Sequence, residues 1–379
     1  MKTRLEVLDV LRGIAILGTL GTNIWLFANA GNLGALFGEN PYASQLEFAL
    51  QQITLMFTNG KFLGMLTIMF GIGLELQYQS AKKRGAAFLP AYLWRSLILL
   101  LDGFIHFVLV IEFDILMGYA VTAMIVAWVV TSGERVMRVV LWSALGVHAI
   151  LVTVGTVALR STGSTEALGD LGSISRVYLD GTYINAIAYR LQNFWILRLE
   201  PIFVIPMGVA LFLFGVRLLR SNALADPTQQ RRMMAWGLGL GLPLNALTLL
   251  PVSGLELMAR YLFAPILSIG YIGLIAHAFG QGWLEPISKR VAMVGRMALS
   301  SYVLQGLLAS VLFYGWGFGL AREPNAYIAL AAWLGIGATL IVFSNLWLRK
   351  FALGPFEAIW KILSELPFKA VRERPAREP

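Results

Sequence analysis

The chain has 379 residues, of which 58% are hydrophobic and only 13% charged, and its formal net charge is +9. Its mean hydropathy is +0.70. This composition excludes a water-soluble globular protein of such length, because too few polar residues remain to cover its surface. The chain contains no cysteine. A disulfide framework, a cysteine-ligated metal and an acyl relay through a protein thiol are therefore excluded as well.

Ten apolar segments follow one another along the chain, separated by short charged connectors. A hydrocarbon layer about 30 Å thick needs roughly 20 apolar residues per helix. We predict membrane-spanning helices at 7–29, 59–79, 91–111, 114–132, 138–159, 199–218, 233–251, 257–279, 296–320 and 327–348. The shorter apolar stretches 47–58 and 352–364 are interpreted as segments at the membrane interface. The predicted fold class is all-α, a polytopic integral membrane helical bundle.

Lysine and arginine are distributed unevenly among the connectors, and this predicts the orientation of the chain. Cytoplasmic loops of membrane proteins retain positive charge. With both termini in the cytoplasm, the inner connectors hold the following cations: Lys2, Arg4, Lys82, Lys83, Arg84, Arg135, Arg138, Arg217, Arg220, Arg231, Arg232, Lys289, Arg290, Arg296, Arg349 and Lys350. Attraction to anionic inner-leaflet lipid then accounts for the net charge, so the expected partner is membrane lipid and not nucleic acid.

The one long polar interruption is 160–198, which this topology makes an extracytoplasmic loop. It divides the chain into an N-terminal five-helix half, 1–159, with the candidate site, and a C-terminal five-helix half, 199–365. Residues 366–379 alternate Arg, Glu and Pro. That pattern is typical of a disordered tail, which this topology places in the cytoplasm.

Within the predicted helix 7–29, Arg12 lies near the inner end and Asn23 follows eleven residues later, about 16 Å further along the helix. A charge in the hydrocarbon region costs about 3 kcal/mol or more, so it marks a pair or a site. One interpretation is that Asp9 pairs with Arg12 while Arg12 reaches the inner headgroups. The other is that Arg12 binds an anionic ligand from the cytoplasm.

The predicted helix 91–111 carries Arg95, Asp102 and His106 at spacings of seven and four residues, so the three lie on one helix face. This polar face must contact protein. A buried histidine held by a carboxylate can act as a general base. We predict that His106 faces a polar cavity with Asp102 or Asp114 close enough to orient it. The alternative is an Asp102–His106 hydrogen bond that only joins helices.

The remaining charged residues indicate structural roles. His106, His148 and His277 are far apart and show no metal-ligand spacing, so no metal is expected. Glu256 and Arg260 stand at i, i+4 and are expected to form a structural pair.

Gly64, Gly71 and Gly73 lie in the predicted helix 59–79. Small residues permit close contact between membrane helices. Their positions also suit a helix that borders a cavity.

Four strings resemble the YeiB-like family of bacterial membrane proteins, a domain of unknown function. They are LEVLDVLRGIAILGTLGTNIWLF, LTIMFGIGLELQ, GFIHFVLVIEFDILMGYAV and VGRMALSSYVLQGLLASVLFYGWGFGL. More distantly, the chain is similar to the transmembrane acyltransferase superfamily, which includes heparan-α-glucosaminide N-acetyltransferase and the bacterial sugar O-acyltransferases. The resemblance implies the bacterial cytoplasmic (inner) membrane and transfer of an acyl group from cytoplasmic acyl-CoA.

The first-helix pattern of the glucosaminide acetyltransferase, Arg-Gly followed about eleven residues later by Asn, matches Arg12, Gly13 and Asn23. By this resemblance Arg12, together with Arg95, is expected to bind coenzyme A phosphates, and Asn23 belongs to the same site. The sugar O-acyltransferases carry a histidine where this chain has Thr22 and Asn23. The catalytic histidine of the glucosaminide enzyme has no counterpart in 30–58.

The YeiB-like pattern Gly-x-x-His followed by Asp-Ile-Leu matches Gly103, His106, Asp114, Ile115 and Leu116. The resemblance therefore implies a base relocated to His106 and oriented by Asp102 or Asp114. The helices 7–29 and 91–111 should then line one continuous cavity with a basic inner mouth and His106 at its outer end.

Three functions are compatible with these features. The first is an acyltransferase with acyl-CoA as donor and an extracytoplasmic or membrane-embedded acceptor, small or lipid-linked. The second is a transporter or flippase of a small anionic or lipid-linked substrate that uses the same buried charges. The third is a non-catalytic scaffold or sensor on the same fold. The oligomeric state is open, and a homodimer is one alternative.

Overall fold

The computed structural model describes residues 2–36, 38–162, 172–250, 254–285 and 287–372. All secondary structure in these residues is helical, which confirms the predicted fold class. The first part contains α1 (Lys2–Ala28), η1 (Leu33–Leu36), α2 (Gln45–Thr58), α3 (Lys61–Lys83), α4 (Phe88–Leu109), α5 (Leu116–Thr131) and α6 (Glu134–Thr162). The middle part contains α8 (Gly172–Asp180), α9 (Tyr183–Gln192), α10 (Phe194–Leu197), α11 (Pro201–Arg220) and α12 (Pro227–Ala246).

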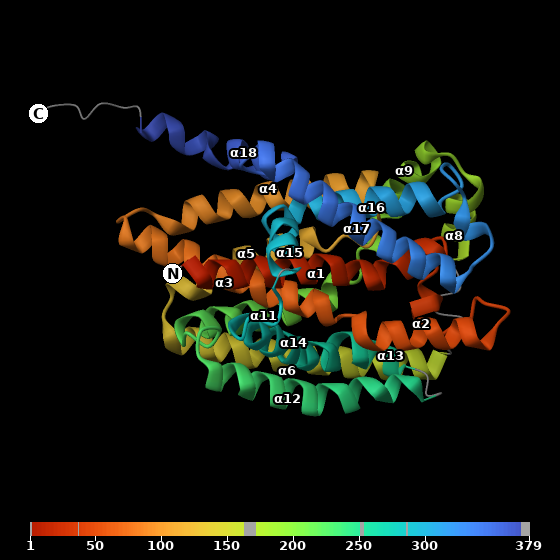
Figure 1. The fold of residues 1–379 in the computed structure, drawn as a ribbon, viewed down its shortest axis with the longest axis horizontal. Helices are drawn as coiled ribbons and strands as arrows, with labels where there is room; N and C mark the ends of the chain where they lie inside the picture. The colour runs from red at the N-terminus through yellow and green to blue at the C-terminus, as the bar shows by residue number, and fades with distance from the viewer. Residues whose placement is uncertain (1, 37, 163–171, 251–253, 286, 373–379) are drawn as a thin grey trace, which may run out of the picture.

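The last part begins with short elements, and its long helices follow. It contains η2 (Leu247–Leu249), α13 (Leu255–Met258), the π-helix η3 (Ala259–Phe263), α14 (Ala264–Gly280) and α15 (Ile287–Arg296). It ends with α16 (Ala298–Phe313), η4 (Leu320–Arg322), α17 (Ala326–Lys350) and α18 (Pro355–Arg372). The long helices run along one common direction and form a bundle (Figure 1).

Each of the ten predicted spans overlaps a helix. Among the described residues, seven helices are long and apolar enough to cross a membrane, or eight if the bent pair α15–α16 counts as one span. The chain is therefore a membrane protein with transmembrane helices. Leu116–Thr131 is a shorter apolar helix, and α12 completes the ten predicted segments. The number ten and the orientation stay predictions.

Two predicted elements differ in shape from the structure. The span predicted at 296–320 corresponds mainly to α16, which ends at Phe313, and α16 is bent by 88° from the preceding helix α15. The segment 47–58, interpreted as interfacial, is instead the first part of a 39-residue apolar helical stretch, Gln45–Lys83. A break at Asn59–Gly60 separates α2 from α3, and Gly60 has φ +81° there. Glycine suits this left-handed backbone because it has no Cβ.

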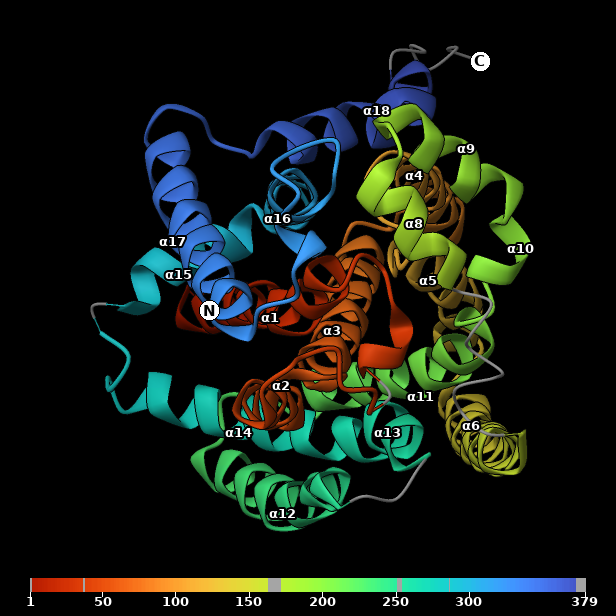
Figure 2. The ribbon, with the colours of Figure 1, turned by 90° about the vertical axis from the view of Figure 1, so that its right-hand side faces the viewer.

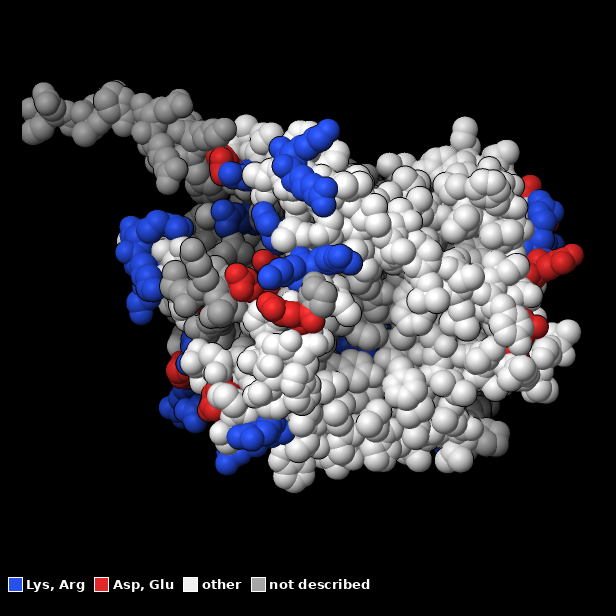
Figure 3. Space-filling model, viewed as in Figure 1, with Lys and Arg blue, Asp and Glu red and all other residues white. Residues whose placement is uncertain are grey.

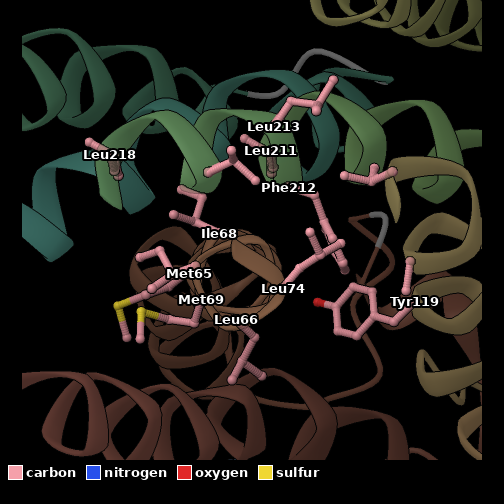
Figure 4. Close-up of a cluster of buried hydrophobic side chains, with 14 of the residues drawn as sticks. Met65, Leu66, Ile68, Met69, Leu74, Tyr119, Leu211, Phe212, Leu213 and Leu218 are labelled. Atoms are coloured by element: carbon pink, nitrogen blue, oxygen red, sulfur yellow. The ribbon is translucent and has the colours of Figure 1, made fainter. Parts of the chain in front are cut away.

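α3 lies at the centre of the bundle and packs against α1, α11 and α14 (Figure 2). Its side chains interlock with those of α11 and with Tyr119 of α5 (Figure 4). The Tyr119 hydroxyl donates to the Leu63 carbonyl over 3.0 Å and lies 2.8 Å from the Thr67 hydroxyl. These bonds satisfy polar groups that water cannot reach inside the bundle.

Glycines permit the closest helix contacts, as the sequence predicts. A Cβ on Gly71 would overlap the backbone of Phe212 in α11, and a Cβ on Gly295 would overlap the backbone of Asp9. Gly73 is different, since a Cβ there would meet only the Arg12 guanidinium, 3.7 Å away. Of the two predicted roles, Gly71 thus has the packing role and Gly73 borders a cavity, on the same helix.

The outer surface is apolar along the bundle and charged at its ends. Large side chains of α6, among them Trp142, Ile150 and Val154, are more than 60% exposed, which fits a lipid-facing surface. Lys and Arg gather over the end of the bundle at which α1 begins and α18 ends (Figure 3). This distribution agrees with the charge asymmetry in the sequence.

Residues 160–198 and the C-terminal tail contain more helix than the sequence suggests. The described part of 160–198 folds into α8, α9 and α10 after the end of α6. α18 continues through Arg372 and so extends into the tail expected from residue 366. The remainder of that tail, 373–379, lies outside the described residues.

Candidate functional site

His106 and Asp114 form a buried pair between the end of α4 and the start of α5. His106 Nδ1 lies 3.0 Å from Asp114 Oδ1, and the two side chains are 2% and 0% exposed. The second carboxylate oxygen, Oδ2, accepts a hydrogen bond from the backbone N–H of Met117 over 3.1 Å. Negative charge is stabilised at a helix N-terminus, so the start of α5 fixes the carboxylate that holds the ring.

The close approach of α4 to α5 depends on Gly103, one turn before His106. A Cβ on Gly103 would lie 2.7 Å from the Met117 nitrogen and 2.9 Å from Asp114 Oδ2. Contacts that short are repulsive. The Gly-x-x-His spacing therefore places the imidazole directly beside the Asp114 turn.

The other ring nitrogen, His106 Nε2, has no hydrogen-bond partner in the described structure although it is buried. It borders a cavity of about 10 Å³ that is also lined by Asn23, Tyr302 and Gln305. Both side-chain amide atoms of Gln305 are buried without a partner as well. Buried polar atoms are normally hydrogen-bonded, and this volume is of the order of one water. The cluster therefore has unused hydrogen-bonding capacity directed at one small space.

A larger cavity of about 360 Å³ lies next to this pair, between α1, α3, α4, α5, α15, α16 and α18. Its apolar and aromatic lining comprises Ile16, Leu66, Met69, Phe70, Leu74, Tyr92, Leu99, Ile115, Leu116, Tyr119, Ala123, Ala298, Leu299, Tyr302 and Trp360. Its volume is within the range of small-molecule sites. It suits a ligand with an apolar portion.

Three arginines, Arg12, Arg95 and Arg296, supply the positive charge of this larger cavity. Arg12 also pairs with Asp9 over 3.4 Å, so the predicted pairing forms while Arg12 lines the cavity. Arg95 donates to the neutral amide of Gln77. Among the described residues neither Arg95 nor Arg296 forms an ion pair with a carboxylate. The cavity therefore combines an apolar body with unneutralised cations, which favours an anionic amphiphile.

α18 covers part of the larger cavity with Glu357 and Trp360. Glu357 accepts from the backbone N–H groups of Leu299 and Ser300 over 2.8 and 3.0 Å. Its charge is thereby committed to the N-terminus of α16. The Trp360 ring lies 6.0 Å from the Arg95 guanidinium. The negative charge of Glu357 is therefore already stabilised by the N-terminus of α16.

Tyr302 lines both cavities, and its ring centroid lies 4.8 Å from that of His106. The predicted single cavity is thus divided in two, with this ring between the arginines and the imidazole. Asn23 belongs to the small cavity with His106, while Arg12 and Arg95 meet in the large one. The structure therefore brings the predicted site residues of α1 and α4 together in two groups.

Asp102, the other predicted partner of His106, does not orient the imidazole. No hydrogen bond joins it to His106 in the described residues, and its Oδ2 is buried without a hydrogen-bond partner. Asp114, eight residues after His106, orients the ring instead. A turn between two helices can bring a distant carboxylate closer than the i, i+4 neighbour on the same helix.

The pair expected between Glu256 and Arg260 does not form. Glu256 accepts from the backbone N–H of Gly254 over 3.0 Å, and Arg260 Nη2 lies 2.9 Å from Glu200 Oε1. Arg260 belongs to a π-helix, whose altered winding changes the spacing on which an i, i+4 pair depends. His148, expected to be structural, bonds the Tyr261 carbonyl over 2.8 Å.

Sequence reasoning assigned no role to Tyr302, Gln305 or Arg198. Tyr302 and Gln305 lie within the string SSYVLQG, where a glutamine inside an apolar helix was the available signal. Arg198 donates to the Asp114 carbonyl over 2.8 Å. It comes from the polar segment before α11, and nothing in the sequence links that segment to the α4–α5 turn.

Comparisons with known proteins agree with the proposed resemblance. Residues 217–366 match the family described as "Protein of unknown function (DUF418)". The chain is 25% identical to YxaH of Bacillus subtilis, over 98% of this chain and 96% of that protein. It is 28% identical to YeiB of Escherichia coli, over 94% of this chain and 95% of that protein. Both relatives are described as uncharacterised. The resemblance of this chain to YeiB and similar uncharacterised proteins is thus confirmed, and its residues 217–366 carry the DUF418 match.

Proposed function

We propose that the protein is an acyltransferase of the bacterial cytoplasmic membrane, which moves an acyl group from cytoplasmic acyl-CoA to a small or lipid-linked acceptor. The observation that carries the proposal is the unpartnered Nε2 of His106, held by the His106–Asp114 pair beside a small cavity that Asn23 and Gln305 also line. Its neighbour is the large apolar cavity with three arginines. The acyltransferase resemblance of the first helix supports the same reading.

His106 serves as the general base in this proposal. When Nδ1–H donates to Asp114, the lone pair on Nε2 is available to accept a proton. Nε2 removes the proton from the acceptor hydroxyl or amine, whose oxygen or nitrogen bonds to the carbonyl carbon of the donor. The carbon–sulfur bond then breaks, and the leaving coenzyme A thiolate takes the proton from Nε2. Asp114 stabilises the imidazolium between these steps.

The donor occupies the larger cavity in this proposal. Arg12, Arg95 and Arg296 meet its phosphate groups, since arginine binds phosphate through charge-assisted hydrogen bonds. The apolar lining accommodates the acyl-bearing end of the donor. The Gln305 amide borders the same small cavity as Nε2 and donates to the developing oxyanion.

A transporter of a small anionic or lipid-linked substrate is the second candidate. The observation that favours it is the pair of interrupted helices, the 88° bend between α15 and α16 and the break between α2 and α3. Discontinuous helices are common at the substrate sites of transporters. Ala298, Leu299 and Tyr302, directly after the bend, line the large cavity.

Thiol release from acetyl-CoA or a longer acyl-CoA tests the proposal. Because the chain has no cysteine, the protein itself adds nothing to the signal of a thiol reagent, and acyl-CoA-dependent signal above that of the extract alone reports the coenzyme A that is freed. The purified protein in nanodiscs, supplied with membrane extract as the source of acceptor, is expected to release thiol, and His106→Gln is expected to abolish the release. Calorimetry should detect coenzyme A binding to both forms. Absence of binding at millimolar coenzyme A, with substrate flux into liposomes, would favour transport instead.

A further inference from the structure

The segment from α8 to α10 contacts the turn that carries Asp114 through a series of side-chain bonds. Tyr183 of α9 donates to the Leu109 carbonyl over 2.7 Å. Arg190, also of α9, donates to the carbonyls of Val108 and Val110 over 2.9 and 3.1 Å. The end of α4 would otherwise leave these carbonyls without intrahelical partners. The α4 C-terminus is therefore held from outside by α9.

Arg198, just after α10, holds the next part of the same turn. Its Nη1 donates to the carbonyl of Asp114 over 2.8 Å and to that of Glu112 over 3.3 Å. Its guanidinium lies 5.3 Å from the Phe107 ring, the neighbour of His106 in sequence. One side chain thus contacts both the residue that supplies the carboxylate and the helix end that supplies the imidazole.

A buried charge cluster anchors this arrangement. Tyr178 of α8 donates to Glu112 Oε2 over 2.5 Å, and Arg190 Nε donates to the Tyr178 hydroxyl over 2.9 Å. Arg190 Nε lies 3.6 Å from Glu112 Oε2. Burial raises the pKa of Glu112 above its usual value, against the opposing effect of Arg190. The cluster is almost fully enclosed, so it fixes the distance between α8, α9 and the turn.

Asp114 reaches His106 only if its own peptide is correctly placed. Its side chain makes two bonds in different directions, to His106 Nδ1 and to the Met117 N–H. The residues between α4 and α5 are irregular, so no helical ladder holds them. A small rotation of the Asp114 peptide would move the carboxylate away from one of its two partners. The contact that opposes this rotation is the Arg198 bond to the Asp114 carbonyl.

We propose that Arg198 is a positioning residue for the His106–Asp114 pair, acting through the backbone carbonyls of Glu112 and Asp114. The segment α8–α10 thus becomes part of the site although none of its residues lines either cavity. This inference rests on the proposed function only in giving the pair its role as base; the geometric coupling itself holds for any chemistry at His106.

Nitrogen NMR of histidine in the full-length protein tests the coupling without an enzymatic assay. The protein is labelled with ¹⁵N-histidine and placed in nanodiscs, and its three histidines are assigned from His106→Gln, His148→Gln and His277→Gln. Asp114→Asn defines the His106 Nδ1–H resonance after loss of the carboxylate bond. Arg198→Met is expected to move that resonance toward the Asp114→Asn position and to leave His148 and His277 unchanged. Arg198→Lys, which can donate to one carbonyl, should restore part of the shift.

Arg322→Met is the matched control, because Arg322 also donates to a backbone carbonyl, that of Leu179 over 2.7 Å. Its side-chain partners among the described residues are Leu179 and Asp180, and it has no hydrogen bond or ion pair to the α4–α5 turn. It should leave all three histidine resonances in place. An unchanged His106 resonance in Arg198→Met would overturn the proposal. If Arg198→Met does not fold, Arg198→Gln, whose shorter neutral side chain also loses the guanidinium bonds to the two carbonyls, is judged by the same criterion. A shifted resonance without any acyl transfer in the native protein would retain the positioning role and reject the proposed reaction.

Discussion

Two polar pairs in this bundle, the buried His106–Asp114 pair and the partly buried Arg260–Glu200 pair, differ in how completely their hydrogen-bonding groups are satisfied. Arg260 uses three nitrogens, on Asn59 at 2.5 Å, Glu200 at 2.9 Å and Tyr261 at 3.2 Å. Tyr261 also donates to Glu200 over 2.7 Å. His106, in contrast, has one nitrogen bonded and one without a partner.

This difference separates structural polar groups from candidate reactive ones. A closed network stabilises the fold, because every donor and acceptor finds a partner inside a medium that supplies none. A buried donor or acceptor without a partner lowers the stability of the fold unless a water or a ligand forms the missing hydrogen bond. Unused hydrogen-bonding capacity beside a cavity is therefore a better guide to function than the presence of a buried charge.

Loss of the unpartnered Nε2 of His106 is expected to have the largest effect on activity. His106→Gln should lower the rate of acyl transfer by at least about 100-fold, since general-base catalysis contributes roughly 10²–10⁴-fold. Coenzyme A affinity should change little, because His106 does not line the large cavity. Thiol release and calorimetry measure the two quantities. His277→Gln is the control and should retain activity; equal losses in both variants would remove His106 from its proposed role.

Opening the closed network is expected to destabilise the fold. Arg260→Met removes the cation paired with Glu200 and the donor to Asn59. Breaking a fully buried pair from one side costs about 3–5 kcal/mol, and because this pair is 11% and 21% exposed, the loss should lie at or below the lower end of that range. Thermal unfolding in nanodiscs should report the loss, whereas the folded fraction should bind coenzyme A normally. Arg322→Met breaks an exposed pair with Asp180 and should cost less than about 1 kcal/mol. A similar small cost for Arg260→Met would contradict the comparison.

Removal of a cavity arginine should weaken donor binding without affecting the chemical step. Arg12→Ala is expected to raise the Kd for coenzyme A by about 10- to 100-fold, since a charge-assisted hydrogen bond contributes roughly 1.5–3 kcal/mol. The kcat should stay close to that of the native protein. Asp9→Asn supplies the matched control, because it removes the carboxylate that pairs with Arg12 and should leave affinity equal or higher. Weaker binding in Asp9→Asn would argue against Arg12 as a phosphate ligand.

Two glycines of α3 should show the smallest contrast. Gly73→Ala places a methyl group in the cavity lining beside Arg12, so KM for the donor should rise by no more than several-fold, most for long acyl chains. Gly71→Ala instead overlaps the α11 backbone and should lower stability by about 1–3 kcal/mol. Steady-state kinetics and thermal unfolding measure the two effects. If Gly71→Ala raised KM and Gly73→Ala lowered stability, the cavity would lie on the face of α3 that carries Gly71, contrary to the structure.

The sequence identified several members of the candidate site but not their grouping. Spacing placed Arg95, Asp102 and His106 on one face of a helix, and the structure retains that helix. It could not decide between Asp102 and Asp114 as the partner of His106. That choice depends on the path of the backbone between α4 and α5, which Gly103 allows to approach closely.

The sequence by itself determined the all-helical membrane fold, the approximate positions of the long apolar helices and the asymmetry of charge between their ends. These properties follow from apolar length and from the cost of placing charge in hydrocarbon, both of which are local. Tertiary structure alone decided that Arg198 donates a hydrogen bond to the Asp114 carbonyl and that Arg260 pairs with Glu200. Tyr302 likewise takes its place between the two cavities only in the folded bundle. Such contacts join residues far apart in the chain, because helix packing and the bends between helices select which polar groups meet.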